Sequence, residues 1–174
     1  MRIMSKKINL KITIEETAER HPVPILGTDY KVKIIYRNIK VAELDLEDKI
    51  IKISLPNKYK KANNEKILDI AIDKMYEQIA KVEVERAMEK TRILLGFAPE
   101  DYEIKKISNG LGKCKENKIT INPEIVKYNR EIIDYIVLHQ YCHLKYKSHC
   151  KSFTKMLEKY EPNYKKIERI LYKI

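Results

Sequence analysis

Three histidines lie close together near the C-terminal end of the sequence and could bind one metal ion. They are His139, His143 and His149, three of only four histidines in the chain. On a helix, residues four apart differ by about 40° around the axis and about 6 Å along it, so His139 and His143 face the same side. On a continuous helix His149 would face roughly 120° away, so we predict that the helix ends near residues 145–147. Three neutral imidazoles with a fourth position open are typical of a catalytic zinc site.

Gln140 stands where the zinc-binding H-E-x-x-H helix carries its glutamate. In hydrolases of this kind the glutamate is not a ligand but the general base that takes a proton from water. Glutamine cannot accept a proton at neutral pH, so we expect metal binding to survive and turnover to fall by about 100- to 10,000-fold. Either the natural protein has lost the base or glutamine was introduced in its place. The intact remainder of the motif favours a recent or engineered change.

The spacing leaves alternatives for the remaining metal ligands. A downstream glutamate could replace His149, and two cysteines flank the ligand histidines; the candidates are Glu158, Glu161, Glu168, Cys142 and Cys150. His149 has the spacing of the longer H-E-x-x-H-x-x-G-x-x-H pattern. Cys142 points about 100° away from His143 on a helix. The sequence therefore favours the three histidines.

The composition indicates a chain that folds around a core and carries a strong positive charge. It has 174 residues, 44% of them hydrophobic, and a net charge of +11 from 29 Lys and 7 Arg against 25 acidic residues. No apolar run approaches the roughly 20 residues of a membrane span. Three cysteines without a C-x-x-C pair argue against a disulfide-stapled secreted protein. We expect a soluble, cytoplasmic protein. Scarce arginine means that nucleic-acid binding is possible but not favoured.

The hydrophobic pattern predicts strands first and helices afterwards, which is typical of an α+β fold. Apolar residues alternate at 8–14, 32–36, 41–46 and 50–55, which predicts strands in an antiparallel meander or a small curved sheet. From Asn63 or Asn64 the spacing is helical as far as Gly96, as one helix or as two with a break near Lys81. A strand pair at 102–107 and 118–121 follows.

The rest of the chain is predicted to be helical, with asparagine and serine caps. Asn122 and Asn129 can each begin a helical stretch, and the second of these carries the histidines. Ser148 is the expected cap of the next helix, which ends at residues 161–163 and precedes a last short helix.

Several segments together resemble the YgjP-like metallohydrolases, zincin-type proteins related to the SprT and WLM groups. The specific part is 133–153, where Phe153 follows the third histidine by four residues as in that family. Three further segments agree in order along residues 22–172: the Leu-Gly entry at 25–30, Leu111-Gly112-Lys113-Cys114 in place of W-G-S-C, and the Pro-x-Tyr at 161–164.

The resemblance implies a β-rich N-terminal lobe over 1–62 and a zincin-like region over 63–174 with a small antiparallel sheet, together forming one compact unit. It implies Zn²⁺ on His139, His143 and His149, with Mg²⁺ as the alternative metal. Members of the family are classed as metallopeptidases, and one branch is assigned as a nucleoside-triphosphate pyrophosphatase acting on UTP.

Three functions follow as hypotheses: a metallopeptidase weakened by Gln140, a nucleotide pyrophosphatase, and a non-catalytic zinc-stabilised binding domain. The excess of lysine modestly favours a polyphosphate substrate over a peptide. By the resemblance, Leu111, Gly112 and Cys114 form a substrate-binding edge near the metal, although Leu111 replaces the family's tryptophan and Gly110 its arginine.

Overall fold

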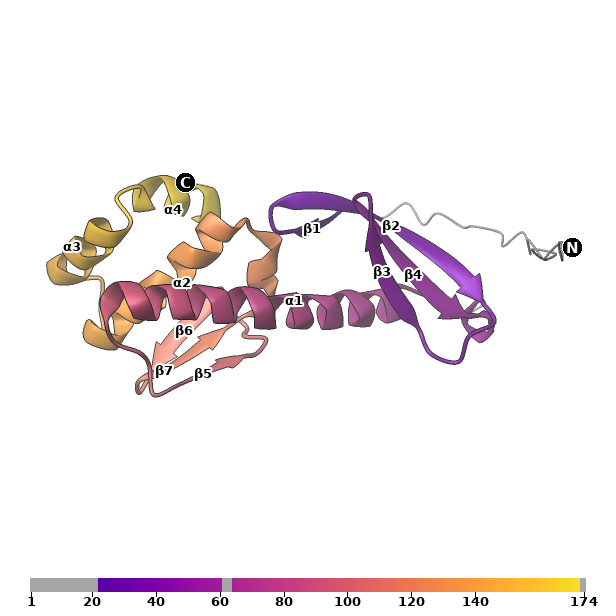
Figure 1. Ribbon diagram of the computed structural model, residues 1–174, viewed down its shortest axis with the longest axis horizontal. Coiled ribbons are helices and arrows are strands. Elements are labelled where there is room, and N and C mark those ends of the chain that lie inside the picture. Colours follow the sequence, from indigo (N-terminus) through magenta and orange to yellow (C-terminus); the bar gives the residue numbers. More distant parts are fainter. Residues whose placement is uncertain (1–21, 61–63, 173–174) are drawn as a thin grey trace, which may run out of the picture. The chain divides into compact units, whose positions relative to one another are not determined.

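The computed structural model describes residues 22–60 and 64–172, with the side chain of Asn64 left out (Figure 1). The described chain divides into two units, one formed by 30–68 with Pro22 and the other by 23–29 and 69–172. The expected strand at 8–14 and the expected cap at Asn63 or Asn64 lie outside what is described.

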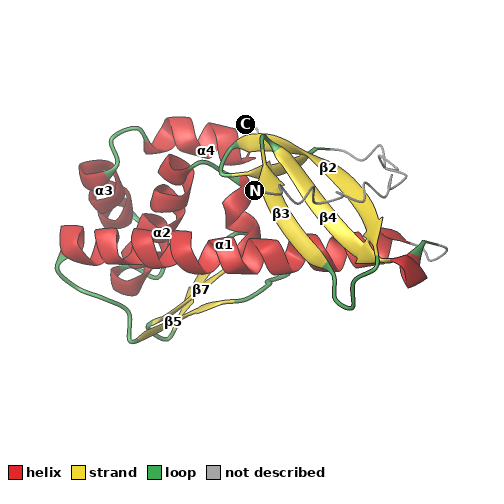
Figure 2. Cartoon of the chain, turned by 45° about the vertical axis from the view of Figure 1, so that its right-hand side comes forward, coloured by secondary structure: helices red, strands yellow, loops and turns green. Residues whose placement is uncertain are grey.

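The sheet of the first unit is mixed. This four-stranded sheet includes β2 (Thr28–Arg37), β3 (Glu43–Glu47) and β4 (Ile50–Pro56), of which β4 lies between the other two (Figure 2). The short η1 (Asn57–Tyr59) follows β4. β3 and β4 are antiparallel, but β2 runs parallel to β4, with Val32 opposite Ile51. The predicted antiparallel meander is therefore wrong for β2. The largely exposed β3 lies at the edge, which leaves β4, buried along most of its length, at the centre.

One continuous helix, α1 (Asn64–Leu95), follows, without the break considered near Lys81. It ends as predicted at Gly96, which has a φ of +74° and donates its N–H to the Arg92 carbonyl at 2.9 Å. Glycine adopts this left-handed conformation without a steric penalty and so terminates helices well. Although α1 is long, no helix among residues 22–60 and 64–172 is apolar enough to cross a membrane.

The second unit contains a small mixed sheet formed by β5 (Asp101–Ile104), β6 (Gly112–Lys115) and β7 (Lys118–Ile121). The order is β5-β7-β6: β7 is parallel to β5 and antiparallel to β6. The expected pairing of the segments at 102–107 and 118–121 forms, although the first strand ends at Ile104. The two strands are parallel, so the predicted small antiparallel sheet is wrong for β5 and holds for β6 with β7. β6 is left at the edge, beside the helix that carries the histidines.

Four helical segments complete this unit: η2 (Pro123–Lys127), α2 (Arg130–Lys145), α3 (Lys151–Tyr160) and α4 (Tyr164–Tyr172). Asn122 and Asn129 cap η2 and α2 as predicted, accepting from the backbone N–H groups of Glu124 and Ile132. Ser148 is not the cap of α3. That position belongs to Cys150, whose side chain makes no capping bond.

The start of α2 is fixed by the turn after β1 (Val23–Ile25). The backbone N–H of Leu26 donates to the Val126 carbonyl at 2.7 Å, and that of Gly27 to the Lys127 carbonyl at 3.3 Å. A Cβ on Gly27 would lie 3.1 Å from the Cβ of Asn129, so this Leu-Gly pair presses directly against the cap of α2. The first short strand thereby holds the beginning of the histidine helix.

Candidate metal centre

The structure brings His139, His143 and His149 together around one point. α2 presents the first two from adjacent turns, and its end at Lys145 lets the chain return with the third. The Nε2 atom of His149 lies 3.0 Å from Nε2 of His139 and 3.1 Å from Nε2 of His143. One ring nitrogen from each residue falls within 4.8 Å of the other two, close enough to share a metal ion.

Phe153 packs against all three imidazoles. Its ring centroid lies 5.0 Å from that of His139 and 4.7 Å from those of His143 and His149. Phe153 is itself 2% exposed, on α3. An aromatic ring in this place restricts the imidazoles to orientations in which their nitrogens meet.

The outer nitrogens of two of the histidines are held by hydrogen bonds. Nδ1 of His143 lies 3.1 Å from the carbonyl oxygen of Tyr146. A carbonyl only accepts, so this Nδ1 carries the proton and Nε2 keeps its lone pair. Nδ1 of His139 lies 3.3 Å from the hydroxyl of Tyr135.

Burial keeps the imidazoles of His139 and His143 in the form that binds metal. It lowers the pKa of His139 to about 4, helped by the positive charges that His143 and His149 would carry. Burial also lowers the pKa of His143, against the opposing effect of the Tyr146 carbonyl. Metal ligation requires neutral imidazole. Three convergent nitrogen donors without a carboxylate among them suit Zn²⁺.

A cleft of about 510 Å³ opens onto the three histidines. One side is formed by 110–114, the edge strand β6 with the residues before it, so Leu111, Gly112 and Cys114 all line this cleft. Burial raises the pKa of the half-buried Cys114, whereas Cys142 is fully buried and its pKa is raised to about 12. Cys142 is not among the clustered potential metal ligands of the described chain.

Gln140 also lines the cleft, although it is only 7% exposed. A Cβ built on Gly112 would lie 2.9 Å from both Cγ and Nε2 of Gln140. The absence of a side chain on Gly112 thus makes room for the side chain at position 140. The sequence motif contained this glycine but did not reveal its contact.

The three downstream glutamates are placed differently from the histidines. Glu168 accepts a hydrogen bond from the Tyr135 hydroxyl at 2.8 Å, and Glu161 accepts one from the backbone N–H of Asn163. Within the described parts of the chain, the three histidines form the only group of three or more potential ligands close enough to hold a metal ion. Tyr135 and Tyr146 were not predicted. Of these two, Tyr135 could have been found from the sequence, because it precedes His139 by one helical turn and so lies on the same face of the helix.

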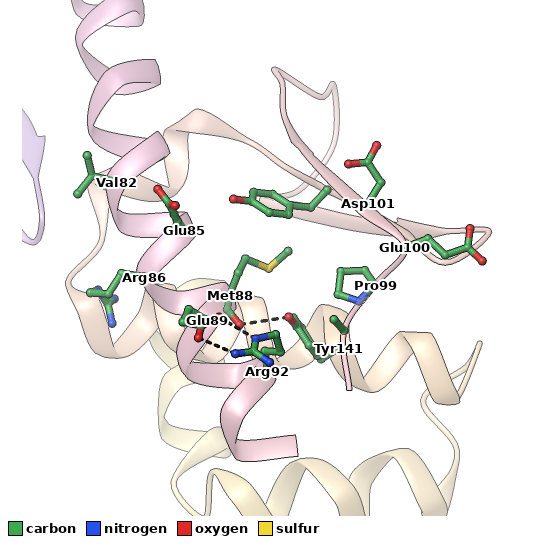
Figure 3. Close-up of a pocket in the computed structure, with 12 residues that line it drawn as sticks. Val82, Glu85, Arg86, Met88, Glu89, Arg92, Pro99, Glu100, Asp101 and Tyr141 are labelled. Atoms are coloured by element: carbon green, nitrogen blue, oxygen red, sulfur yellow. Dashed lines mark hydrogen bonds and ion pairs between the residues drawn. The ribbon is translucent and has the colours of Figure 1, made fainter. Parts of the chain in front are cut away.

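A second hollow, of about 750 Å³, is formed by α1, residues 98–102 and Tyr141 (Figure 3). Here the Tyr141 hydroxyl donates to the carbonyl of Met88 at 3.2 Å, and Arg92 is paired with Glu89. No histidine or cysteine lines it. The cluster of potential metal ligands in the described part of the chain lies at the histidine cleft and not in this hollow.

Comparison with known proteins shows which family the chain belongs to. Residues 3–173 match the family model of the YgjP-like metallopeptidase domain. The solved structures that resemble the chain include the metallopeptidase zymogens abylysin of Pyrococcus abyssi and jannalysin of Methanocaldococcus jannaschii. Abylysin is 27% identical with a TM-score of 0.47, and jannalysin is 21% identical with a TM-score of 0.46. Each alignment covers 52% of this chain and 94% of the other. No curated protein matches. The match over nearly the whole chain shows that it belongs to the YgjP-like metallopeptidase family.

Proposed function

We propose that this chain is a zinc-dependent hydrolase of peptides whose general base is replaced by Gln140. The observation that carries the proposal is the convergence of three Nε2 atoms, 3.0 and 3.1 Å apart, at a cleft that Gln140 also lines. Family membership supports metal-dependent hydrolysis, and the family's metallopeptidase domain supports a peptide substrate.

His139, His143 and His149 would hold the metal ion through Nε2. When bound, Zn²⁺ supplies Lewis-acid chemistry, polarising a carbonyl oxygen and making water more acidic. The hydrogen bond between Nδ1 of His143 and the Tyr146 carbonyl directs the Nε2 lone pair toward the shared point. The low pKa of His139 keeps this ligand neutral at pH 7.

The edge strand β6 would bind an extended peptide. As the edge of its sheet, it offers backbone groups to which a substrate strand can add. Leu111, Gly112 and Cys114 line the cleft on this side, and we assign them to substrate contact. Gln140 can hydrogen-bond a substrate or a water molecule but cannot take a proton from it.

A nucleoside triphosphate is the second candidate substrate. Among the described residues, the cleft is lined by Lys113 and Lys147 and by no acidic side chain. Two ammonium groups beside a metal centre would suit a polyphosphate, with Mg²⁺ as the alternative metal. Peptide remains our first choice because the family is defined by a metallopeptidase domain.

Restoring the base tests the proposal. Gln140→Glu should raise hydrolysis of unstructured peptides by at least about 100-fold, the low end of what a general base contributes. Metal content and fold should stay unchanged, because the two side chains match in size. Gln78→Glu is the matched control, since Gln78 is an exposed glutamine on α1 and the charge change is the same.

Both variants are assayed on peptides and on nucleoside triphosphates, each with zinc and with magnesium. Activation on nucleotides alone would replace the peptidase assignment with the pyrophosphatase. If Gln140→Glu holds full zinc and hydrolyses neither substrate, the chain is a non-catalytic zinc-stabilised domain and the proposal is wrong.

A further inference from the structure

We infer that Glu168, on the last helix, is a positioning residue that acts through Tyr135 to set the tautomer of His139. The inference adds to the proposed metal site, and its effect on metal affinity rests on that proposed function. Its structural part, a relay of two hydrogen bonds, concerns the metal-free protein as well.

The relay connects two helices that are far apart in sequence. Tyr135 lies one turn before His139 on α2, with its hydroxyl 2.8 Å from Oε1 of Glu168 and 3.3 Å from Nδ1 of His139. Glu168 belongs to α4. Tyr135 is only 2% exposed, so water does not readily replace either partner. The Tyr135 ring also meets the His139 imidazole edge-on, with centroids 5.8 Å apart.

The number of protons available determines which atom donates in each of the two hydrogen bonds. A phenol has one proton, and a carboxylate can only accept, so Tyr135 donates that proton to Glu168. Toward His139 the phenol oxygen then has only lone pairs to offer. Nδ1 of His139 must therefore be the donor in the second bond. In neutral imidazole a proton on Nδ1 leaves Nε2 bare, and Nε2 is the atom that points at His149.

Without Glu168 the same hydroxyl would work against metal binding. Tyr135 could then donate its proton to Nδ1, which favours the tautomer with the proton on Nε2. A protonated Nε2 cannot ligate. The tautomer of His143 does not depend on a second carboxylate, because its Nδ1 bonds a backbone carbonyl that can only accept. Glu168 thus makes the last helix part of the metal site without supplying a ligand.

The first experiment reads the His139 tautomer directly, by nitrogen NMR of the metal-free protein at a pH where imidazoles are neutral. We expect the proton on Nδ1 in the unmodified chain. Glu168→Ala should move it to Nε2, and Tyr135→Phe should give a mixture. Glu168→Gln retains an acceptor oxygen and should stay close to the unmodified chain. Glu158→Ala, which removes an exposed carboxylate from α3, is the matched control.

The second experiment measures zinc affinity by competition with a chelator. Loss of an outer hydrogen bond to a ligand typically costs about 10- to 100-fold in metal affinity, and we expect that loss for Glu168→Ala and for Tyr135→Phe. The double variant should be no weaker than Tyr135→Phe, because Glu168 acts only through Tyr135. Circular dichroism checks that each variant keeps its helices.

An unchanged His139 tautomer in folded Glu168→Ala would overturn the inference, as would losses that add in the double variant. If Glu168→Ala fails to fold, the other two proteins test the inference. It holds if the unmodified chain carries the proton on Nδ1 of His139 and Tyr135→Phe gives a mixture of tautomers, and it is wrong otherwise. If the unmodified chain binds no zinc, the proposed function fails instead, and the tautomer measurement still judges the relay.

Discussion

The contact between Gly112 and Gln140 limits the size of the side chain that position 112 tolerates. A Cβ at 112 would lie 2.9 Å from Gln140, closer than such atoms approach without rearrangement. Gly112→Ala should therefore push the Gln140 side chain aside and lower the free energy of unfolding by about 1–3 kcal/mol, the usual cost of overpacking. Urea denaturation measures the change. Lys113→Ala, at an exposed neighbouring position on the same strand, is the control and should change little.

A double-mutant cycle separates this contact from a general effect on the strand. In a Gln140→Ala background the clash has no partner, so Gly112→Ala should cost much less there. Equal costs in the two backgrounds would show that the glycine acts on the β6 backbone and not on the side chain at 140.

At the residue scale, the sequence was most informative where chemistry depends on local spacing. His139 and His143 lie on one helix, and the position of His149 required the turn that the structure has after Lys145. The relay to Glu168 could not be predicted. Tyr135 and Glu168 are 33 positions apart, and only the packing of α4 against α2 brings them together. From sequence, Glu168 was instead a candidate ligand.

At the scale of elements, α1 and α2 are joined by a network of charges. Glu83 of α1, 4% exposed, accepts hydrogen bonds from Arg130 of α2 and from Arg86. Asp134 of α2 accepts from Arg86 and Lys90 of α1. A buried carboxylate shared by two guanidinium groups is satisfied only when both helices are in place. The network therefore holds the histidine helix against α1.

Glu83→Gln tests this network. The hydrogen bonds from Arg130, and then the one from Arg86, hold the pKa of Glu83 below its ordinary value of 4.5 despite burial. The folded state thus favours the charged form, so the stabilisation is fully present above pH 4.5 and is lost as the pH falls through the folded-state pKa. At pH 7 the variant should lower the free energy of unfolding by about 2 kcal/mol.

The variant should also flatten the acid side of the stability profile, measured by urea denaturation at a series of pH values. Glu85→Gln is the control, since Glu85 is an exposed glutamate two residues along the same helix. If both variants show the same profile as the unmodified chain, Glu83 does not join the helices in the way described.

Among the elements, helices were easier to predict than strand partners. The caps at Asn122 and Asn129 and the end at Gly96 are set by local hydrogen bonds that short motifs specify. Alternation identified the strands of the first unit, but it carries no information about direction. The parallel pairing of β2 with β4 therefore appeared only in the structure. Ser148 failed as a cap because α3 begins two residues later than expected.

At the scale of the whole molecule, the α+β class and the family were both confirmed. The order of strands and helices predicted the class. The histidine segment, with three further segments in order along residues 22–172, predicted the family. The net charge of +11 did not identify a substrate. In the described structure, Lys113 and Lys147 are the lysines that bring positive charge to the metal cleft. Charge spread over a chain cannot show which lysines will share a site.

The measurement that bears most directly on this account is zinc content by elemental analysis after equilibrium dialysis. We predict about one zinc ion per chain and an accompanying rise in the midpoint of thermal unfolding, because a ligand of the folded state stabilises it. His143→Ala and His149→Ala should each lose the metal and the stabilisation. His21→Ala, which removes the fourth histidine of the sequence, should keep both. Full zinc retention in His143→Ala, or no zinc in the unmodified chain, would contradict the assignment of the three histidines as a metal centre.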